Sequence, residues 1–365
     1  MKKVLFTATV DSHIINFHIP YLKWFKENGY EVHVATNGED KIPFCDVKHK
    51  VSFERNPLKI NNIKAIRQLK KIIEKEKCEI IHCHTPMGSV VTRLATMKAR
   101  KKYNVKVIYT AHGFHFYKGA PLINWMIYYP IEKWLSKCTD CLITINKEDY
   151  NLAKRKFRTK QIELVHGVGV DENKFKNIKI NKEEKLKELD LQSNKKIVIT
   201  VAELTKGKNH ETIIRAIKDM DNVYYLICGE GKLENYLKEL VNQLGMKDKV
   251  IFLGFRKDIN ELLSISDLFV FPSYREGLPV AVMEAMFVGV PILASNIRGI
   301  TDLITDDKYL ISANDVEKYK YCIEELLSNK EICNKVIEDN SKNINTYSLQ
   351  NIENEMKKIY NNVKS

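Results

Sequence analysis

Short apolar segments alternate with longer amphipathic segments twice along the chain, and this alternation limits the possible folds more than any other feature. The first round predicts strands at residues 4–8, 30–35, 79–83, 106–110, 141–145 and 162–165. Helical patterns separate them at 14–26, 60–77, 86–102, 121–137 and 147–157. Strands that are apolar along their whole length and separated by helices indicate a parallel sheet covered on both faces.

A polar, lysine-rich linker at 167–196 precedes the second round. This round predicts strands at 197–201, 223–228, 250–253, 268–272 and 291–294, with helices at 210–218, 231–245, 258–265 and 279–288. Three further helical patterns follow at 315–328, 330–340 and 348–363. We therefore expect an α/β protein with two doubly wound, Rossmann-like domains, 1–170 and 171–345, and a C-terminal helix within 346–365 that packs back toward the first domain. Such domains bind ligands at the carboxyl ends of their strands, so we expect a ligand cleft between them.

The charge of the chain is unevenly distributed. The 365 residues include 59 basic and 46 acidic ones, a net charge of +13. Residues 1–170 hold 30 basic and 15 acidic residues, whereas the remainder holds 29 and 31. No segment approaches the ~18 uninterrupted apolar residues of a membrane span, which excludes an integral membrane protein. Eight cysteines in mostly apolar segments, without a cleavable signal, favour reduced thiols in the cytoplasm.

The densest motif is the loop at 271–279, which follows an apolar strand and leads into a helix. Pro279 suits the first helical turn, so the N–H groups of Gly277 and Leu278 are available at a positive helix end, where a diphosphate binds favourably. Glu284 lies seven residues beyond Gly277, further along the same face, where its carboxylate can accept hydrogen bonds from sugar hydroxyls. A capped helix with solvated glutamates fits the same spacing.

This segment closely resembles the signature of the retaining glycosyltransferases of family 4, a glycogen-synthase-like group with the two-domain GT-B fold. Seven residues separate the two glutamates of that signature, as they separate Glu276 and Glu284. The resemblance implies that Glu276 contacts the donor sugar and that Glu284 holds the ribose of a nucleotide sugar. It extends over essentially the whole chain, most strongly from 196 to 305, and is to members that assemble capsular polysaccharide and exopolysaccharide.

Other segments match the family in the expected order. Lys208 falls where a lysine of the family binds the donor diphosphate. The family often carries an arginine where this chain has Glu203 in the nucleotide-sugar site, and the sequence does not choose among its possible substitutes, which are Arg275, Lys206 and Arg298. Two glycine turns, one at Gly229 and one at 252–258, border the nucleotide in the family. The residues then expected near the base are Phe255, Arg256 and Lys257.

Histidines gather in the first half of the chain. His112 follows an apolar strand and resembles the histidine that approaches the transferred sugar in polysaccharide-assembly members, with His115 as second choice. Asp11 and His13 follow the first strand, where relatives often have a glycine-rich turn, and together with His115 they are candidates for acceptor binding. We expect no metal site at 82–84, because Cys83 must point to the opposite face of its strand from His82 and His84.

The resemblance implies transfer with retention of anomeric configuration, in which a phosphate oxygen takes the proton of the acceptor hydroxyl. Lys208 and the helix end would stabilise the departing diphosphate, so we expect no metal or other cofactor. The expected donor is a nucleotide sugar, UDP-linked, that carries a hexose or an N-acetylhexosamine. The expected acceptor is a polyprenyl-diphosphate-linked glycan or another cell-surface saccharide precursor.

The basic excess has several interpretations. Basic residues repeat on helical spacing at 55, 59, 64, 67, 70, 71, 75 and 77, with a second cluster at 98, 100, 101 and 102. An ordinary solvated helix face explains them, and so does peripheral docking on the anionic inner face of the cell membrane. A basic nucleic-acid-binding protein would also fit the charge, but no nucleic-acid-binding signature is present, so we expect no such partner. A GT-B epimerase or phosphorylase is the enzymatic alternative.

Overall fold

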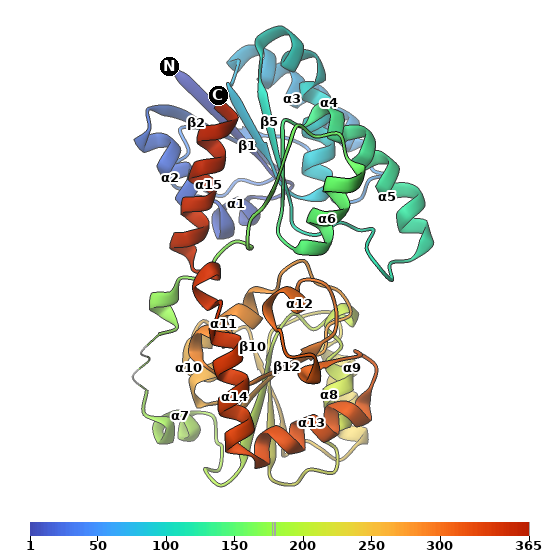
Figure 1. Ribbon diagram of the computed structural model, residues 1–365, viewed down its shortest axis with the longest axis vertical. Helices are drawn as coiled ribbons and strands as arrows, with labels where there is room; N and C mark the ends of the chain where they lie inside the picture. Colours follow the sequence, from blue (N-terminus) through green and yellow to red (C-terminus); the bar gives the residue numbers. More distant parts are fainter. Residues whose placement is uncertain (177, 179, 365) are drawn as a thin grey trace. The chain divides into compact units, whose positions relative to one another are not determined.

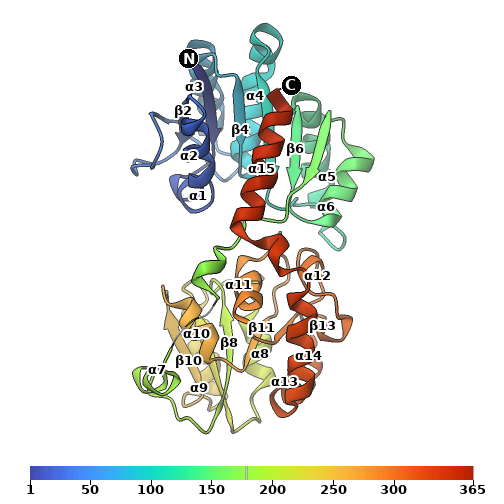
Figure 2. The ribbon, with the colours of Figure 1, turned by 60° about the vertical axis from the view of Figure 1, so that its left-hand side comes forward.

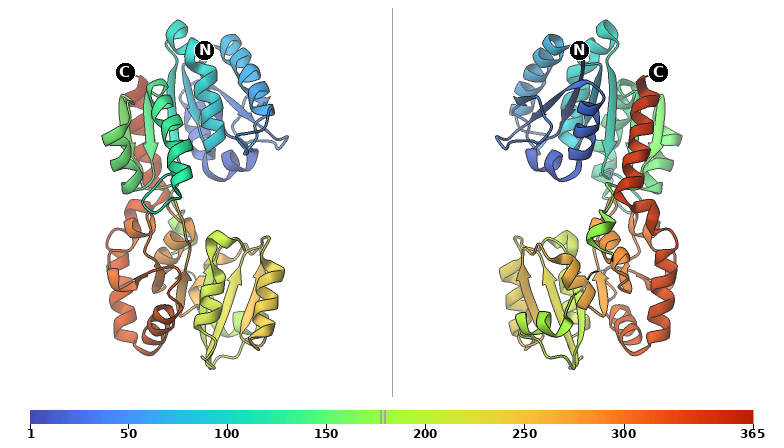
Figure 3. Two further views of the ribbon diagram at one scale, coloured as in Figure 1. Left: turned by 90° about the vertical axis from the view of Figure 1, so that its right-hand side faces the viewer. Right: turned by 90° about the vertical axis from the view of Figure 1, so that its left-hand side faces the viewer.

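The computed structural model describes residues 1–176, 178 and 180–364, which form two compact units. Unit 1 comprises Met1–Val168 together with the C-terminal residues from Ile352, and unit 2 comprises Gly169–Asn351. In each unit helices flank a sheet of parallel strands (Figure 1; Figure 3). This is the α/β architecture, with two doubly wound sheets, that the alternating sequence pattern predicts.

Unit 1 has a seven-stranded parallel sheet in the order β3-β2-β1-β4-β5-β6-β7. Its strands are β1 Lys2–Thr7, β2 Tyr30–Thr36, β3 Val47–Lys50, β4 Ile80–Cys83, β5 Lys106–Ala111, β6 Cys141–Thr144 and β7 Gln161–Leu164. Its helices are α1 Asp11–Phe17, α2 Ile19–Glu27, α3 Asn61–Glu76, α4 Pro86–Tyr103, α5 Leu122–Leu135 and α6 Lys147–Lys156, joined by most of α15 Leu349–Lys364. Most residues of the central strands β1, β4 and β5 are buried, which explains why these strands are mainly apolar in sequence.

Unit 2 has a six-stranded parallel sheet in the order β10-β9-β8-β11-β12-β13. Its strands are β8 Lys196–Val201, β9 Val223–Cys228, β10 Val250–Gly254, β11 Leu268–Phe271, β12 Ile292–Ser295 and β13 Leu310–Ile311. Its helices are α7 Lys182–Glu188, α8 His210–Ala216, α9 Glu234–Gln243, α10 Ile259–Ile265, α11 Val280–Val288, α12 Ile300–Leu303, α13 Val316–Ser328 and α14 Lys330–Ser341. The loops after β8 and β11, which carry the residues expected at the donor, emerge side by side because these two strands are paired and parallel.

The single helix expected at 14–26 is wrong, because the chain forms two helices there. α1 ends at Phe17, His18 adopts φ −125°, and α2 restarts at Ile19 with Pro20 in its first turn. Proline has no N–H to continue a helix, and its ring clashes with the preceding turn, so the break falls just before it. The break leaves the His18 side chain buried at the corner between the two helices.

Two strands were not predicted from the sequence, β3 and β13. β3 has the sequence Val-Lys-His-Lys at the sheet edge and is only half-buried, so it lacks the apolar run that marked the others. β13 has only two residues, Leu310 and Ile311. Both strands lie at the end of their sheet, where pairing on one side needs little apolar sequence.

The C-terminal helix α15 packs into unit 1 along one face of its sheet (Figure 2). Its buried side chains repeat at helical spacing: Ile352, Met356, Ile359, Tyr360 and Val363. They share a core cluster with residues of β1, β2 and α2. The residues from Ile352 onward therefore complete the hydrophobic core of unit 1.

Candidate functional site

In unit 2 the loop between β11 and α11 is tied to the loop after β8. The amide of Asn209 donates to the backbone oxygens of Pro272 (3.1 Å) and Ala313 (2.7 Å), and the Tyr274 N–H donates to the Gly207 oxygen (2.8 Å). α11 begins at Val280, which makes Pro279 its N-cap residue rather than part of its first turn. The two loops therefore form one rigid surface at the positive end of α11.

Lys208 and Glu276 meet on this surface. The Lys208 Nζ lies 2.6 Å from the Glu276 Oε1, and it also lies 5.2 Å from the centre of the Phe271 ring. Both residues are half-buried. The structure therefore places the lysine expected at the donor diphosphate in direct contact with the glutamate expected at the donor sugar.

A close backbone approach fixes the position of Gly277. Gly299 has φ +78°, and a Cβ added there would lie 2.1 Å from the Gly277 oxygen. The neighbouring Arg298 is buried, and its Nε donates a hydrogen bond to the backbone oxygen of Glu276 (3.2 Å). Arg298 is thus held at the donor loop, whereas Arg275 and Lys206, the other cations that could replace the family's arginine, are exposed.

Glu284 is the only charged residue of α11, whose other positions are apolar. Its carboxyl group is half-buried, and within the described part of the chain no group donates a hydrogen bond to it. Burial raises the pKa of Glu284 to about 7, against a small lowering by the charge of Lys174. A carboxylate left without a donor in an apolar helix is suited to accept hydrogen bonds from a ligand.

The glycine turn after β9 packs against the loop after β8. A Cβ on Gly229 would lie 2.0 Å from the Ala202 oxygen, and one on Gly231 would lie 2.5 Å from the Leu204 oxygen. Glu203 is exposed, and its backbone oxygen accepts hydrogen bonds from the Thr205 N–H (2.9 Å) and the His210 Nε2 (3.2 Å). Both glycines are therefore required by the close packing of the two loops.

The residues expected near the base differ in their surroundings. Phe255 is 70% exposed and Lys257 is exposed, so both side chains are accessible to a ligand. The Arg256 guanidinium instead donates to Asp258 (2.5 Å) and Glu188 (2.8 Å). These hydrogen bonds outweigh burial and raise the pKa of Arg256 above its ordinary value. The arginine thus anchors this loop to α7, and base recognition by all three residues stays a prediction.

In unit 1, β1, β4 and β5 are adjacent and parallel, so the residues after them lie at one edge of the sheet. His112 follows β5 directly, and burial lowers its pKa to about 4. His13 lies in α1 after β1; burial and the charges of His112 and Arg55 lower its pKa to about 3. The rings of His13 and His112 are 4.8 Å apart, so the structure brings these two candidates together.

The other two acceptor candidates have different environments. Asp11 accepts hydrogen bonds from the Thr36 hydroxyl (2.5 Å), the Asp40 N–H (2.8 Å) and the Lys48 Nζ (2.7 Å). Burial would raise the pKa of Asp11, but these hydrogen bonds lower it overall. Asp11 therefore holds the loops of unit 1 together. His115 is half-buried, with its ring 4.8 Å from that of Tyr128.

A large apolar cavity opens beside these residues. Its volume is about 940 Å³, and its lining is mostly aliphatic and aromatic, including Ile63, Ile66, Met87, Val90, Leu94 and Ile127. Arg55 and Lys59 also line it, as do His13 and His115. At one side the buried Arg93 pairs with Glu132 (2.8 Å). The cavity therefore combines space for a long apolar group with basic and polar residues.

The chain was compared with protein families and with individual proteins. Residues 3–146 match the family "Glycosyl transferase 4-like", and residues 181–343 match "Glycosyl transferases group 1". EpsD of Bacillus subtilis (strain 168), named as a glycosyltransferase, is 41% identical over 98% of this chain and 96% of its own length. This chain belongs to the family 4-like glycosyltransferases. The enzyme has the GT-B fold of that group.

Further relatives agree with this assignment. The UDP-Gal:alpha-D-GlcNAc-diphosphoundecaprenol alpha-1,3-galactosyltransferase of Escherichia coli is 33% identical to the enzyme over 73% of this chain and 70% of its own length. Among solved structures, Anabaena HepE in complex with UDP and glucose matches with a TM-score of 0.80, at 17% identity, over 99% of this chain and 100% of HepE. At that identity the HepE match bears on the fold alone.

Sequence reasoning did not single out His18, and it considered His84 only together with His82 and Cys83, as a metal site that we did not expect. The rings of His18 and His84 lie next to those of His13 and His112. A signal for His84 was available, because it follows an apolar strand in the same way as His112 does. His18 carried no such signal, because its position depends on the break between α1 and α2. We expected Cys83 to point to the opposite face of the strand from His82. The structure agrees, because Cys83 packs against Val107 and Tyr109 in one core cluster, whereas His82 contacts Tyr360, which belongs to another.

Proposed function

We propose that the enzyme transfers a hexose or N-acetylhexosamine from a UDP-sugar to a glycan carried on a polyprenyl diphosphate, with retention of anomeric configuration. The apolar cavity of unit 1 is the observation that carries this proposal. A glycosyltransferase with a water-soluble sugar acceptor has no need of a 940 Å³ space lined by aliphatic side chains. The printed name of the E. coli relative, which specifies a diphosphoundecaprenol acceptor, supports the same class of acceptor.

The cavity suits such an acceptor in polarity as well as in size. A polyprenyl diphosphate has an apolar chain and an anionic head, and the cavity lining includes many aliphatic residues together with Arg55 and Lys59. Burying the chain against the aliphatic residues gains about 25 cal/mol per Å². The two cations would attract the diphosphate. His13 and His115, which also line the cavity, would then lie toward the glycan.

The donor is proposed to bind unit 2. The diphosphate would accept hydrogen bonds from the N–H groups of Gly277 and Leu278 at the positive end of α11, and Lys208 would neutralise its charge. The half-buried Glu284, to which no described group donates, would accept the ribose hydroxyls. Glu276 would contact the donor sugar, and we assign a contact with the same sugar to His112 on the strength of the family resemblance.

In the proposed reaction the bond between the anomeric carbon and the diphosphate oxygen breaks while the acceptor hydroxyl attacks from the same side. A phosphate oxygen of the departing UDP takes the hydroxyl proton. Lys208 and the α11 end stabilise the negative charge that grows on that phosphate, and such preorganised donors typically contribute a factor of 10² to 10³ each. We propose that these groups act at the donor site without a divalent metal ion.

We also propose that unit 1 docks on the anionic inner face of the cell membrane to reach this acceptor. In residues 1–176, 178 and 180–364, no helix is both long enough and apolar enough to span a bilayer. α5, however, exposes Leu122, Met126 and Trp134, and Leu58 and Ile60 are exposed beside the cavity. Exposed apolar residues next to an excess of basic residues are typical of interfacial contact.

Incubation of the purified enzyme with labelled UDP-sugars, with and without a synthetic polyprenyl-diphosphate-linked sugar, tests the proposal. We expect label in the lipid fraction only when the lipid acceptor and the correct UDP-sugar are both present, and an α-linkage from an α-donor in the NMR spectrum of the product. Conversion of the donor without acceptor would indicate an epimerase. Reaction with free phosphate would indicate a phosphorylase, and an inverted linkage would refute retention.

A further inference from the structure

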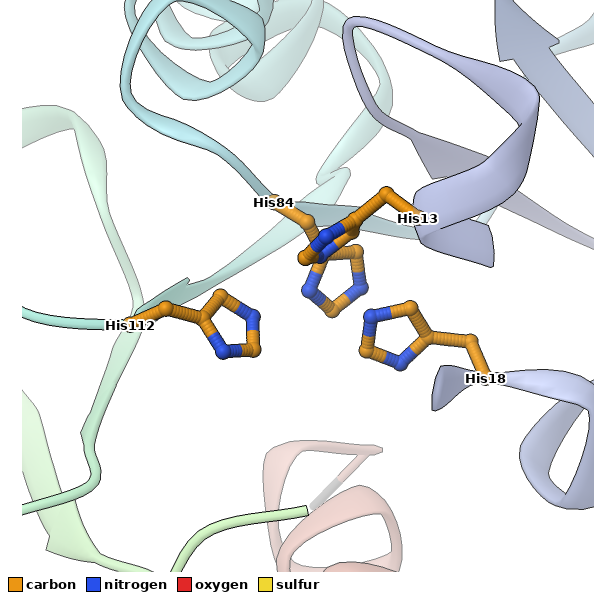
Figure 4. Close-up of side chains that lie close together, drawn as sticks. All are labelled: His13, His18, His84 and His112. Atoms are coloured by element: carbon orange, nitrogen blue, oxygen red, sulfur yellow. The ribbon is translucent and has the colours of Figure 1, made fainter. Parts of the chain in front are cut away.

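Four histidine rings converge in unit 1 from four different segments (Figure 4). His13 lies in α1, His18 between α1 and α2, His84 directly after β4 and His112 directly after β5. One nitrogen from each ring can be chosen so that all four atoms lie within 4.8 Å of one another. The cluster thus presents four nitrogen ligands around a common point.

Six ring nitrogens of these four residues are buried without hydrogen-bond partners among the described residues, although His13 and His112 as whole residues are half-buried. His18 is 3% exposed and His84 is fully buried, and neither ring nitrogen of either residue has a partner among the described residues. The Nε2 atoms of His13 and His112 are unpaired in the same way. Buried polar atoms in folded proteins nearly always have a partner, because an unpaired one keeps the full cost of leaving water. The cluster is therefore incomplete without a ligand.

A fifth histidine shows that the same region can satisfy a buried ring. His82 is also fully buried, and its ring lies 4.0 Å from that of His84. Its Nδ1 is 2.9 Å from the Tyr360 hydroxyl, and its Nε2 is 2.8 Å from the Thr110 hydroxyl. His84 lies two residues further along the chain, just after β4, and neither of its ring nitrogens has such a partner among the described residues. This contrast separates His82, a structural histidine, from the four that face one another.

We propose that His13, His18, His84 and His112 bind one divalent transition-metal ion, with Zn²⁺ as the reference ion. Imidazole nitrogen suits Zn²⁺, Co²⁺, Ni²⁺ and Cu²⁺, whereas Mg²⁺ and Ca²⁺ require oxygen ligands, and no carboxylate belongs to the cluster. Tetrahedral zinc with bonds of about 2.0–2.1 Å needs nitrogen atoms about 3.4 Å apart, which shifts of about 1 Å in these side chains would achieve.

The ion would tie together α1, the corner before α2 and the two loops that follow β4 and β5. It would bind the buried Nε2 of His112, which leaves the Nδ1 of that ring for the sugar contact proposed above. It binds the folded chain only, because these segments are separate in the unfolded chain, so binding raises the stability of unit 1. A second group of possible ligands, Glu31, His33 and Glu76, is already occupied: the Lys3 Nζ lies 2.8 Å from Glu76 and 3.3 Å from Glu31. The four-histidine cluster is therefore the site to test.

The experiment uses the full chain without an affinity tag, because a histidine tag would itself bind metal. Chelator-treated protein is equilibrated with Zn²⁺, passed through a desalting column and analysed for metal, and Co²⁺ is titrated in parallel while its visible ligand-field bands are recorded. We expect about one Zn²⁺ per chain and the spectrum of four-coordinate Co²⁺. Zn²⁺ should also raise the midpoint of thermal unfolding.

The test variant is His18→Ala/His84→Ala, and the matched control is His49→Gln, which removes an imidazole of unit 1 outside the cluster. The double variant should lose the bound zinc and the thermal shift, while the control should keep both. If the double variant does not fold, His112→Ala should weaken Co²⁺ binding by more than roughly 100-fold, which is the upper end for loss of a residue that only orients a metal ligand. Wild-type protein without stoichiometric zinc, or a folded double variant that retains it, would overturn the proposal. Because these readouts are independent of sugar transfer, they do not depend on the proposed reaction.

Discussion

The Nζ of Lys208 lies 2.6 Å from the Oε1 of Glu276, although 68 positions separate the two residues in sequence. The contact joins the loop after β8 to the loop before α11 and places a positive charge where the donor diphosphate is proposed to bind. A bound diphosphate would draw the ammonium toward itself and free the Glu276 carboxylate for the donor sugar. The ion pair therefore holds both groups ready in the absence of ligand.

We predict that Lys208→Ala lowers kcat by about 10² to 10³ while the chain remains folded, because it removes one stabiliser of the departing phosphate. The matched control is Lys247→Ala, which removes an exposed lysine of unit 2 that has no proposed role at the donor site. Steady-state kinetics with the lipid acceptor, together with circular dichroism, provides the measurement. Full activity in Lys208→Ala would refute the donor-site assignment, as would an equal loss in both variants.

A second prediction concerns the cost of burying Glu284. Its pKa is about 7 in the folded chain and 4.5 without burial. The folded state therefore favours the protonated form of Glu284. Its contribution to the free energy of unfolding is greatest below pH 4.5 and is lost as the pH rises through about 7. Glu284→Gln removes this cost and should stabilise the ligand-free enzyme at pH 8 by about 1–3 kcal/mol, but not at pH 4.5.

The same substitution should weaken the binding of UDP, because the neutral amide is a poorer acceptor for ribose hydroxyls than a carboxylate. In the wild type, UDP affinity should rise between pH 6 and pH 8 as Glu284 ionises. Urea denaturation and calorimetric titration at several pH values measure the two effects. The control is Glu239→Gln, at an exposed position of α9. A variant that is both less stable at pH 8 and unchanged in UDP binding would contradict this role.

The backbone approach of Gly299 to Gly277 leads to a third prediction. Gly299→Ala adds a Cβ that would lie 2.1 Å from a backbone oxygen, at φ +78°, so it should destabilise unit 2 by about 2 kcal/mol or more and weaken UDP binding. Gly245→Ala is the control that separates the cost of a positive φ from the cost of a steric clash. Gly245 has φ +67°, but no atom lies within 4 Å of the Cβ that alanine would add. It should cost about 1 kcal/mol and leave UDP binding intact. Equal effects on UDP binding in both variants would show that the close approach is unimportant.

The sequence predicted the two sheets because almost every central strand is an uninterrupted apolar run, as in β9 and β11. β3 escaped because an edge strand that is half-exposed needs no such run. The break between α1 and α2 at His18 was not predicted, because the apolar positions of 14–26 keep helical spacing across it. That pattern outweighed the signal from Pro20. Local sequence thus predicted the elements, but not where a proline divides one of them.

The candidate site was predictable to the extent that its residues lie in one motif. Glu276, Gly277 and Glu284 belong to a single loop and helix. Their spacing fitted a diphosphate site or a capped helix with solvated glutamates, and the family resemblance indicated the donor site. The histidine cluster was not predictable, because it requires that β1, β4 and β5 be neighbours, and strand order follows from the packing of the whole unit. Likewise, the pairing of Arg256 with Glu188 depends on where α7 packs.

A fourth prediction is that UDP binds with the same affinity in the presence of Mg²⁺ and in the presence of a chelator. The N–H groups at the start of α11 and the ammonium of Lys208 would neutralise the diphosphate without an ion. Calorimetric titration of UDP measures this directly, and Lys208→Ala should lose affinity under both conditions. A tenfold weaker affinity after chelation, about 1.4 kcal/mol, would show that a metal ion takes part in donor binding.

The last prediction concerns membrane contact through α5. Leu122 and Met126 are 80% and 73% exposed, and basic residues of α3 such as Lys64, Lys71 and Lys75 are exposed as well. If unit 1 docks on a bilayer, apolar and ionic contributions should be separable. Leu122→Asp/Met126→Asp should reduce binding to anionic vesicles at every salt concentration, whereas replacement of the three lysines by glutamine should mainly reduce the salt-sensitive part.

Cosedimentation with phosphatidylglycerol vesicles over a range of salt concentrations measures both contributions. Tyr236→Asp/Tyr321→Asp is the control, because it places the same two charges at exposed aromatic residues of unit 2 and should bind as the wild type does. Neutral phosphatidylcholine vesicles should bind the wild type more weakly than anionic ones, since only the apolar contribution remains. If the wild type does not bind anionic vesicles at low salt, membrane docking is rejected. The lipid-linked acceptor would then have to reach the cavity from solution.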